Sequence, residues 1–222
     1  MADMAKQMER MNRAYGGKSP PSEGEVSVLL RHQNVVHTFD HGISTKKQQF
    51  LVMEFIEGVG LNFLIETKAA NLTGKRINYL IQAADGLAYV HEQQYIHRDI
   101  CPRNLMVTPE GVVKLIDFGL VVPNKPEFRR PGNRAGTANY MAPELIKREV
   151  IDERIDIFSF GVTAYECIVG RFPWEAPDTM QRMVQHMNTP PKDPRLLRPD
   201  LDEELGVLLL RGIARSTKKR IG

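Results

Sequence analysis

Residues 97–104 read His-Arg-Asp-Ile-Cys-Pro-Arg-Asn. They follow a segment with apolar residues at helical spacing, so we expect them in a loop at a helix end. Thirteen residues after Asn104 comes Asp117-Phe118-Gly119, directly behind an apolar run typical of a strand. A third block, Gly136 to Glu144, ends in Ala-Pro-Glu. The three blocks place acids and an amide on loops.

Asp99, Asn104 and Asp117 have the side chains that a site for a metal-bound phosphate needs. Mg²⁺ prefers oxygen ligands such as carboxylates, and an aspartate beside a hydroxyl can act as a general base. The alternative interpretation is that these residues only terminate turns, where Asp and Asn are common. The presence of all three blocks in this order favours the site.

The segments before these blocks indicate a small β-rich front. The apolar runs 34–42 and 49–56 flank the polar turn 44–48, which predicts a β-hairpin. Residues 25–32 are expected to be helical. Residues 1–24 are polar, and we expect a flexible leader there.

The segments after residue 70 indicate a mostly helical back. Apolar residues at helical spacing from Ile77 to His91 predict a helix, which Thr73 or Asn71 would cap. Short strands are expected at 105–107 and 112–116, on either side of a Pro-Glu-Gly turn.

A Pro- and Gly-rich stretch, 118–140, predicts a long loop, and long loops in compact domains are usually functional. Residues 154–169 are apolar on nearly every face, which is typical of a helix in the centre of a core. Gly170 is expected to end that helix. Two amphipathic helices are expected at about 178–187 and 202–214.

The composition excludes several classes of protein. The chain has 222 residues with 42% hydrophobic and 26% charged, which is typical of a soluble globular protein. The net charge of +3 is too small to indicate a nucleic-acid partner. No run approaches the ~20 apolar residues of a membrane helix. Cys101 and Cys167 form no CxxC pair, so an intracellular, cytoplasmic location is expected.

The three blocks resemble the signature of the protein kinase family, in which His-Arg-Asp…Asn, Asp-Phe-Gly and Ala-Pro-Glu follow in that order. The resemblance covers about residue 25 to the end. It implies an α+β, protein-kinase-like fold with a mostly helical C-terminal lobe and a truncated β-rich N-terminal lobe. Residues 1–24 would be the leader, 25–56 the remnant of the N-terminal lobe, and 57–222 the C-terminal lobe.

The resemblance also implies roles for single residues. Asp99 would be the catalytic base, and Asn104 and Asp117 would hold Mg²⁺ against the phosphates of ATP. Thr137, in Gly-Thr-x-x-Tyr, would lie beside Asp99, as in serine/threonine kinases. Arg103 would supply a cation near the transferred phosphate, because Cys101 stands where such kinases usually have a lysine.

The adenine of ATP would bind between the two lobes. Met53 would guard the back of the pocket, and Met106 would form its floor. The backbone of Glu54 and of Ile56 would form hydrogen bonds with the adenine edge. The alternative for the two methionines is that they only fill the core.

Further residues would have structural roles in such a domain. His97 and Phe118 would pack together, and Asp156 would cap the backbone of the 97–104 loop. Glu144 would pair with Arg220. Arg98 would meet an anion on the loop that follows Asp117.

This last loop has no Ser, Thr or Tyr between Gly119 and Gly136, so no phosphate could form there. We expect Glu127 to serve as a permanent anion in its place. The alternative is that Glu127 only pairs with neighbouring arginines in solvent, where exposed ion pairs contribute little.

The sequence departs from the family in its first part. It has no Gly-x-Gly-x-x-Gly loop and no strand lysine. Lys18 is a candidate substitute for that lysine, although its Gly-Gly-Lys-Ser context lacks the first glycine of a P-loop. Glu25 aligns with the family's ion-pairing glutamate, but the stretch from it to His32 is about two residues short. The alternative for Glu25 is an exposed acid at the start of a helix. A buried, inert thiol and a reactive thiolate are both open for Cys101.

Two functions follow from these observations. The first is a serine/threonine protein kinase that transfers the γ-phosphate of ATP to protein substrates, with Mg²⁺ as cofactor. The alternative is a pseudokinase-type module that binds partner proteins without turnover. The intact Asp99, Asn104 and Asp117 favour the first, and the missing glycine-rich loop favours the second. The sequence does not indicate an oligomeric state.

Overall fold

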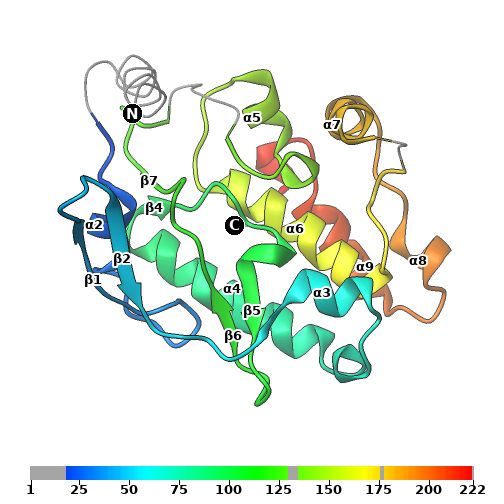
Figure 1. Cartoon of the computed structure of the whole chain (residues 1–222). Helices are drawn as coiled ribbons and strands as arrows, with labels where there is room; N and C mark the ends of the chain where they lie inside the picture. The colour runs from blue at the N-terminus through cyan, green and yellow to red at the C-terminus, as the bar shows by residue number, and fades with distance from the viewer. Residues whose placement is uncertain (1–18, 130–134, 176–177, 222) are drawn as a thin grey trace.

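The computed structural model describes residues 19–129, 135–175 and 178–221. Figure 1 shows a small front part, formed by α2 (Glu23–Ser27), β1 (Thr38–Ile43) and β2 (Gln49–Met53), beside a larger and mostly helical body. This arrangement confirms the expected α+β, kinase-like fold class. Lys18 lies outside the described residues, as does most of the predicted leader.

The predicted hairpin is confirmed, since β1 and β2 pair antiparallel with Gly42 opposite Phe50. It begins later than expected, because Val35 forms a parallel bridge to Leu115 in the body instead of joining β1. The helix predicted over 25–32 is wrong in extent. The chain turns at Val28 and buries Leu30, so α2 has only five residues.

The body contains a three-stranded antiparallel sheet in the order β3 (Val59–Gly60), β5 (Leu105–Val107) and β6 (Val113–Leu115). The helix predicted from Ile77 to His91 is confirmed as α4 (Arg76–Glu92), and it lies against β6.

The predicted caps of α4 are wrong. Asn71 lies within a 3₁₀ helix, Ala70–Leu72, and Thr73 directly follows it. Lys75 therefore precedes α4, without a side-chain cap.

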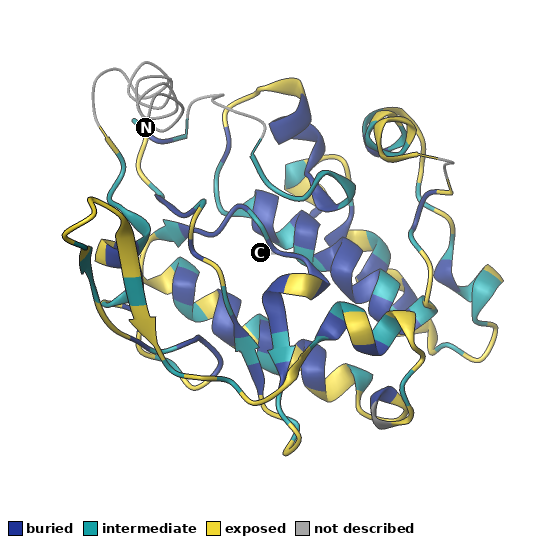
Figure 2. Cartoon of the chain, viewed as in Figure 1, coloured by how far each residue is buried: buried dark blue, intermediate teal, exposed yellow. Residues whose placement is uncertain are grey.

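Helix α6 (Arg154–Val169) is the centre of the core, and Figure 2 shows it mostly in the colour of buried residues. It ends at Gly170, whose φ of 77° is in the left-handed region that glycine tolerates. Helix α9 (Glu203–Gly212) packs directly on it, because a Cβ at Gly161 would lie only 2.8 Å from the carbonyl carbon of Gly212. Both helices were expected at these positions.

The remaining elements are short. The stretch predicted as one long loop contains β7 (Val122–Pro123), which pairs with β4 (Tyr95–Ile96). The other elements are α3 (Leu61–Glu66), α5 (Pro143–Lys147), α7 (Thr179–Asn188), α8 (Pro194–Leu197) and the 3₁₀ helices Pro102–Asn104, Ala138–Tyr140 and Thr217–Lys219. Within the described ranges, no helix is both long enough and apolar enough to span a membrane.

Candidate active site

The loop after β4 is fixed from below by Asp156, near the start of α6. Asp156 is fully buried, and its carboxylate accepts hydrogen bonds from the backbone N–H groups of His97 (2.7 Å) and Arg98 (2.8 Å). His91 Nε2 lies 2.9 Å from the same carboxylate. Arg98 has a φ of 71°, which costs energy for a residue other than glycine. The predicted cap is confirmed, and it holds the turn that presents Asp99.

Asp99 is held on two sides. The Nδ2 of the buried Asn104 donates to the backbone oxygen (2.9 Å) and to Oδ2 (3.0 Å) of Asp99. The backbone N–H of Thr137 donates to Oδ1 at 2.6 Å. This approach requires Gly136, since a Cβ there would lie 2.7 Å from the carbonyl oxygen of Arg98. The first and third sequence blocks therefore meet at this carboxylate.

Thr137 also connects Arg103 to Cys101. The Arg103 guanidinium donates to Thr137 Oγ1 at 3.2 Å, and Thr137 Oγ1 lies 3.6 Å from Cys101 Sγ. Burial raises the pKa of the Cys101 thiol, and the nearby Asp99 raises it further. Of the two interpretations of Cys101, the buried and inert thiol fits this environment, because a reactive thiolate needs a lowered pKa.

The second block adds an exposed carboxylate beside the first. Asp117 follows β6 with a φ of 66°, and its Oδ1 accepts from Gly119 N at 3.2 Å. Phe118 is buried, with its ring edge-on to His97 at 5.0 Å between centroids, as expected. The backbone N–H of Ile116 donates to the carbonyl oxygen of Asn104 at 2.9 Å. This bond fixes the two loops relative to each other.

A cavity of about 560 Å³ opens beside Asp117. All five residues predicted to bind the nucleotide contribute to its wall, namely Met53, Glu54, Ile56, Met106 and Asp117. Sequence reasoning missed the remaining wall residues, which are Glu23, Val36, Phe55 and Ile116. Ile116 could have been found from its place next to Asp117, whereas Val36 arrives only through tertiary packing.

Glu54 braces the segment that lines this cavity. Its Oε1 lies 2.8 Å from Lys114 Nζ and accepts from the backbone N–H of His37 at 2.7 Å. Burial works to raise the pKa of Glu54, but the hydrogen bonds from Lys114 and His37 outweigh it, so the pKa is lowered. The backbone N–H of Glu54 donates to the carbonyl oxygen of His37 at 2.9 Å, so the backbone group of Glu54 that could meet a ligand is its carbonyl oxygen. In the part of the chain that is described, the backbone N–H of Ile56 has no hydrogen-bond acceptor, as an adenine-binding group requires.

Of the two interpretations of Glu25, the exposed acid at the start of a helix is confirmed, and the ion-pairing role is not. Glu25 forms a capping box with Ser22 at the start of α2 and is exposed. Glu23 instead lines the cavity beside Asp117, and this position removes the two-residue deficit noted for Glu25. Burial raises the pKa of Glu23, and the charge of Asp117 raises it further. The stretch from Glu25 to His32 is two residues short, and this shortfall could have indicated Glu23 as the site residue from the sequence.

The carboxylate oxygens at Asp117 are of the kind that binds Mg²⁺. Oxygens of Asp117 and Glu23 lie 3.2 and 3.4 Å from the point that a Cβ of Gly119 would occupy, so a side chain at this position would crowd both carboxylates. Among the described residues, no group of three or more His, Cys, Asp or Glu side chains could hold a metal by itself. Mg²⁺ commonly binds one or two carboxylates and completes its shell with water and phosphate oxygens.

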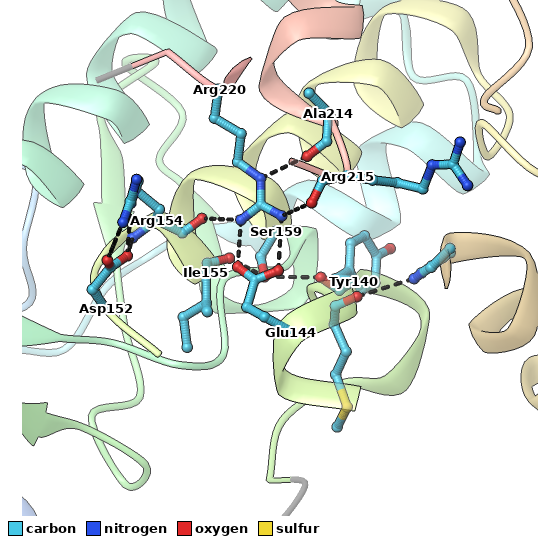
Figure 3. A network of polar contacts seen from close by, with 11 residues as sticks. Tyr140, Glu144, Asp152, Arg154, Ile155, Ser159, Ala214, Arg215 and Arg220 are labelled. Atoms are coloured by element: carbon cyan, nitrogen blue, oxygen red, sulfur yellow. Dashed lines mark hydrogen bonds and ion pairs between the residues drawn. The ribbon is translucent and has the colours of Figure 1, made fainter. Parts of the chain in front are cut away.

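Figure 3 shows the buried network that anchors the third block. The Arg220 guanidinium forms a two-bond ion pair with Glu144, in which Nη2 donates to Oε2 at 2.8 Å. It also donates to the carbonyl oxygens of Arg154 (2.9 Å) and Ala214 (2.7 Å). The predicted Glu144–Arg220 pair is therefore confirmed.

In the same network, Ser159 of α6 donates to the carbonyl oxygen of Tyr140 at 2.8 Å. The Tyr140 hydroxyl donates to Glu166 at 2.6 Å. These contacts fix the segment that carries Thr137.

Comparison with known proteins finds sequence similarity to protein kinases. A sequence model of the protein kinase domain matches residues 3–222. Serine/threonine-protein kinase PknA of Corynebacterium glutamicum is 33% identical over 198 residues, which are 85% of this chain and 41% of that protein. A probable serine/threonine-protein kinase of Clostridium acetobutylicum is 30% identical over 199 residues, 89% of this chain and 30% of that protein.

Pkn1 of Myxococcus xanthus is 31% identical over 207 residues, 90% of this chain and 29% of that protein. The chain thus spans about a third of the length of these relatives. The match covers nearly all of this chain, and it includes every loop that meets at Asp99 and Asp117. The chain belongs to the protein kinase family.

Proposed function

We propose that the chain is a serine/threonine protein kinase, which transfers the γ-phosphate of ATP to a hydroxyl of a protein substrate. One observation carries the proposal. Asp99, held by Asn104 and Thr137, lies on a loop that is bonded to the loop of Asp117. A base and the metal ligands are thereby kept in one fixed arrangement, as positioning of a phosphoryl acceptor requires.

Each residue has a task in this proposal. Asp99 orients the substrate hydroxyl and accepts its proton. Asn104 and Asp117 bind Mg²⁺, which neutralises charge on the ATP phosphates when bound. Thr137 N–H fixes the rotamer of Asp99, and Arg103 places a cation beside the acceptor. Such a cation stabilises negative charge that develops in the transition state.

The cavity residues hold the nucleotide. Met53 and Met106 pack against the adenine, and the backbone groups of Glu54 and Ile56 form hydrogen bonds with its edge. In this proposal residues 25–56 and 57–222 are the two lobes of one kinase domain, and residues 1–24 precede it. The cytoplasmic location that we propose is supported by the free state of both cysteines, Cys101 and Cys167.

One observation favours the second candidate, a partner-binding module without turnover. Among the described residues, the wall of the cavity contains three acids, Glu23, Glu54 and Asp117, and no lysine or arginine. A nucleotide carries several negative charges, so a cavity without a cation binds it less well.

Thermal unfolding with and without ATP and Mg²⁺ separates the two candidates. A ligand at about 100 times its Kd stabilises the folded state by ~2.7 kcal/mol. The kinase proposal expects this stabilisation for the chain and its loss in Asp117→Asn. A flat response in the unchanged chain would exclude ATP binding and leave the partner-binding module. Transfer of labelled phosphate to a protein acceptor, slowed ~10²–10⁴-fold in Asp99→Asn, then tests the reaction itself.

A further inference from the structure

The end of β7 is bonded to the chain just before α6. Asn124, directly after β7, donates from Nδ2 to Glu153 Oε2 at 2.6 Å. Its backbone N–H donates to the carbonyl oxygen of Gln94 at 2.7 Å, next to the pairing of β7 with β4. Asn124 therefore joins the chain before β4, the chain after β7 and the chain before α6.

Arg129 bonds to the other end of the same amide. Its Nε donates to Asn124 Oδ1 at 2.8 Å, and its Nη2 donates to the backbone oxygen of Asn124 at 3.4 Å. The carbonyl oxygen of Arg129 accepts from the backbone N–H of the buried Ile151 at 2.9 Å. Both polar ends of the Asn124 side chain are thus occupied. We call Asn124, Arg129 and Glu153 the latch.

The latch lies beside the two strands that lead to the active-site loops. β4 runs directly into the loop of Asp99, and β7 begins five residues after Asp117. Glu153 precedes Asp156 by three residues, and Asp156 holds the backbone of the Asp99 loop. The latch therefore closes a ring of contacts, which fixes the chain that follows Asp117 relative to the Asp99 loop.

The latch consists of side chains that cannot be phosphorylated. Asparagine, arginine and glutamate have no hydroxyl group, and the sequence has no Ser, Thr or Tyr between Gly119 and Gly136. A phosphate group orders a loop of this kind through charged hydrogen bonds. The carboxylate of Glu153 and the guanidinium of Arg129 supply charged hydrogen bonds at the two ends of one amide.

We propose that the latch holds the loop after Asp117 in the arrangement that phosphate transfer needs, and that it does so without prior phosphorylation of the chain. Asn124 and Glu153 are then positioning residues, which act through the loop of Asp117. The part of this proposal that concerns phosphate transfer rests on the proposed kinase function, whereas the latch itself can be tested without it.

Amide hydrogen exchange of the 222-residue chain tests the latch itself. Asn124→Leu keeps about the size of the side chain and removes both of its polar ends. The N–H of Ile151 should then exchange at least about tenfold faster, because its acceptor is the carbonyl oxygen of a latch residue. The N–H of His97, which has its own buried acceptor, should stay protected and shows that the domain is folded.

Three more variants show whether the bond between Asn124 and Glu153 is the cause. Glu153→Leu removes the bond from the other partner and should behave like Asn124→Leu. Asn124→Asp combined with Glu153→Gln exchanges donor and acceptor, so the bond and the contact with Arg129 are both kept, and the exchange rate should be that of the unchanged chain. Lys125→Leu is the matched control, because Lys125 is exposed at the next position. It should leave the exchange rates unchanged.

Phosphate transfer to casein at saturating ATP and Mg²⁺ tests the link to the reaction. The unchanged chain should transfer phosphate at the same rate before and after phosphatase treatment, with the loss of phosphate verified by mass spectrometry. Asn124→Leu should lower kcat/KM at least about tenfold. Asn124→Asp combined with Glu153→Gln should restore it, which a merely destabilised domain would not show.

Three outcomes would overturn the proposal. The first is an Ile151 N–H that exchanges equally fast in Asn124→Leu and Lys125→Leu. The second is a double variant that exchanges as fast as Asn124→Leu. The third is a chain that transfers phosphate only after it has itself been phosphorylated. The exchange measurements need no ATP, so failure of the latch is distinct from failure of the proposed function.

Discussion

Asp156→Asn tests whether the buried carboxylate holds the loop of Asp99. The substitution keeps the size of the side chain but leaves one oxygen to serve two backbone donors, those of His97 and Arg98. One buried N–H then loses its acceptor, which costs about 1–3 kcal/mol. The remaining bonds lose their charge, and charged hydrogen bonds are roughly twice as strong as neutral ones. We expect a total loss of about 2–4 kcal/mol.

Thermal or urea unfolding measures this loss. For a domain of this size, 1 kcal/mol shifts Tm by about 2–4 °C, so Asp156→Asn should lower Tm by about 5–15 °C. His91→Ala is the control, because it removes one contact of the carboxylate and leaves both backbone donors bonded. It should cost clearly less. A variant Asp156→Asn that unfolds within about 1 °C of the unchanged chain would refute the reasoning.

Asp117→Asn should abolish Mg²⁺-dependent nucleotide binding in calorimetry, whereas Asp99→Asn should spare binding and lower the rate ~10²–10⁴-fold; equal loss of binding in both contradicts these roles. Peptide-array profiling should find arginine upstream of the target hydroxyl disfavoured, since Arg103 carries the same charge; strong arginine selection would count against this. Burial lowers the pKa of His186 to about 4, so the unfolded state binds its proton more tightly. Stability should therefore fall by about 3 kcal/mol as pH drops from about 6.5 to about 4, and His186→Gln should remove this slope from pH-dependent urea unfolding.

The catalytic half of the site could be predicted from local sequence. Asp99, Asn104 and Asp117 are fixed by short loops between regular elements, so their order along the chain already indicates that they lie together. The buried helix at 154–169 was equally clear, because its apolar residues cover every face. The pairing of Glu144 with Arg220 came from the family resemblance, and the structure confirms it.

The front part could be predicted less well, because its details depend on tertiary contacts. Glu25 looked suitable for the site, yet Ser22 begins a capping box that directs Glu25 to solvent and Glu23 to the cavity. Val36 reaches the wall of the cavity only through tertiary pairing, in which its own backbone N–H donates to the carbonyl oxygen of Leu115 at 2.9 Å. The anion role of Glu127 stays a prediction.

The pair of Glu144 and Arg220 also affects the order in which the domain can fold during synthesis. Its members are 76 residues apart in the sequence. At a synthesis rate of about 5–20 residues per second, Glu144 emerges roughly 4–15 s before its arginine exists. Through that interval the carboxylate has no cation to offset its burial, which is costly for a charge. The segment that positions Thr137 therefore cannot settle until Arg220 has been made.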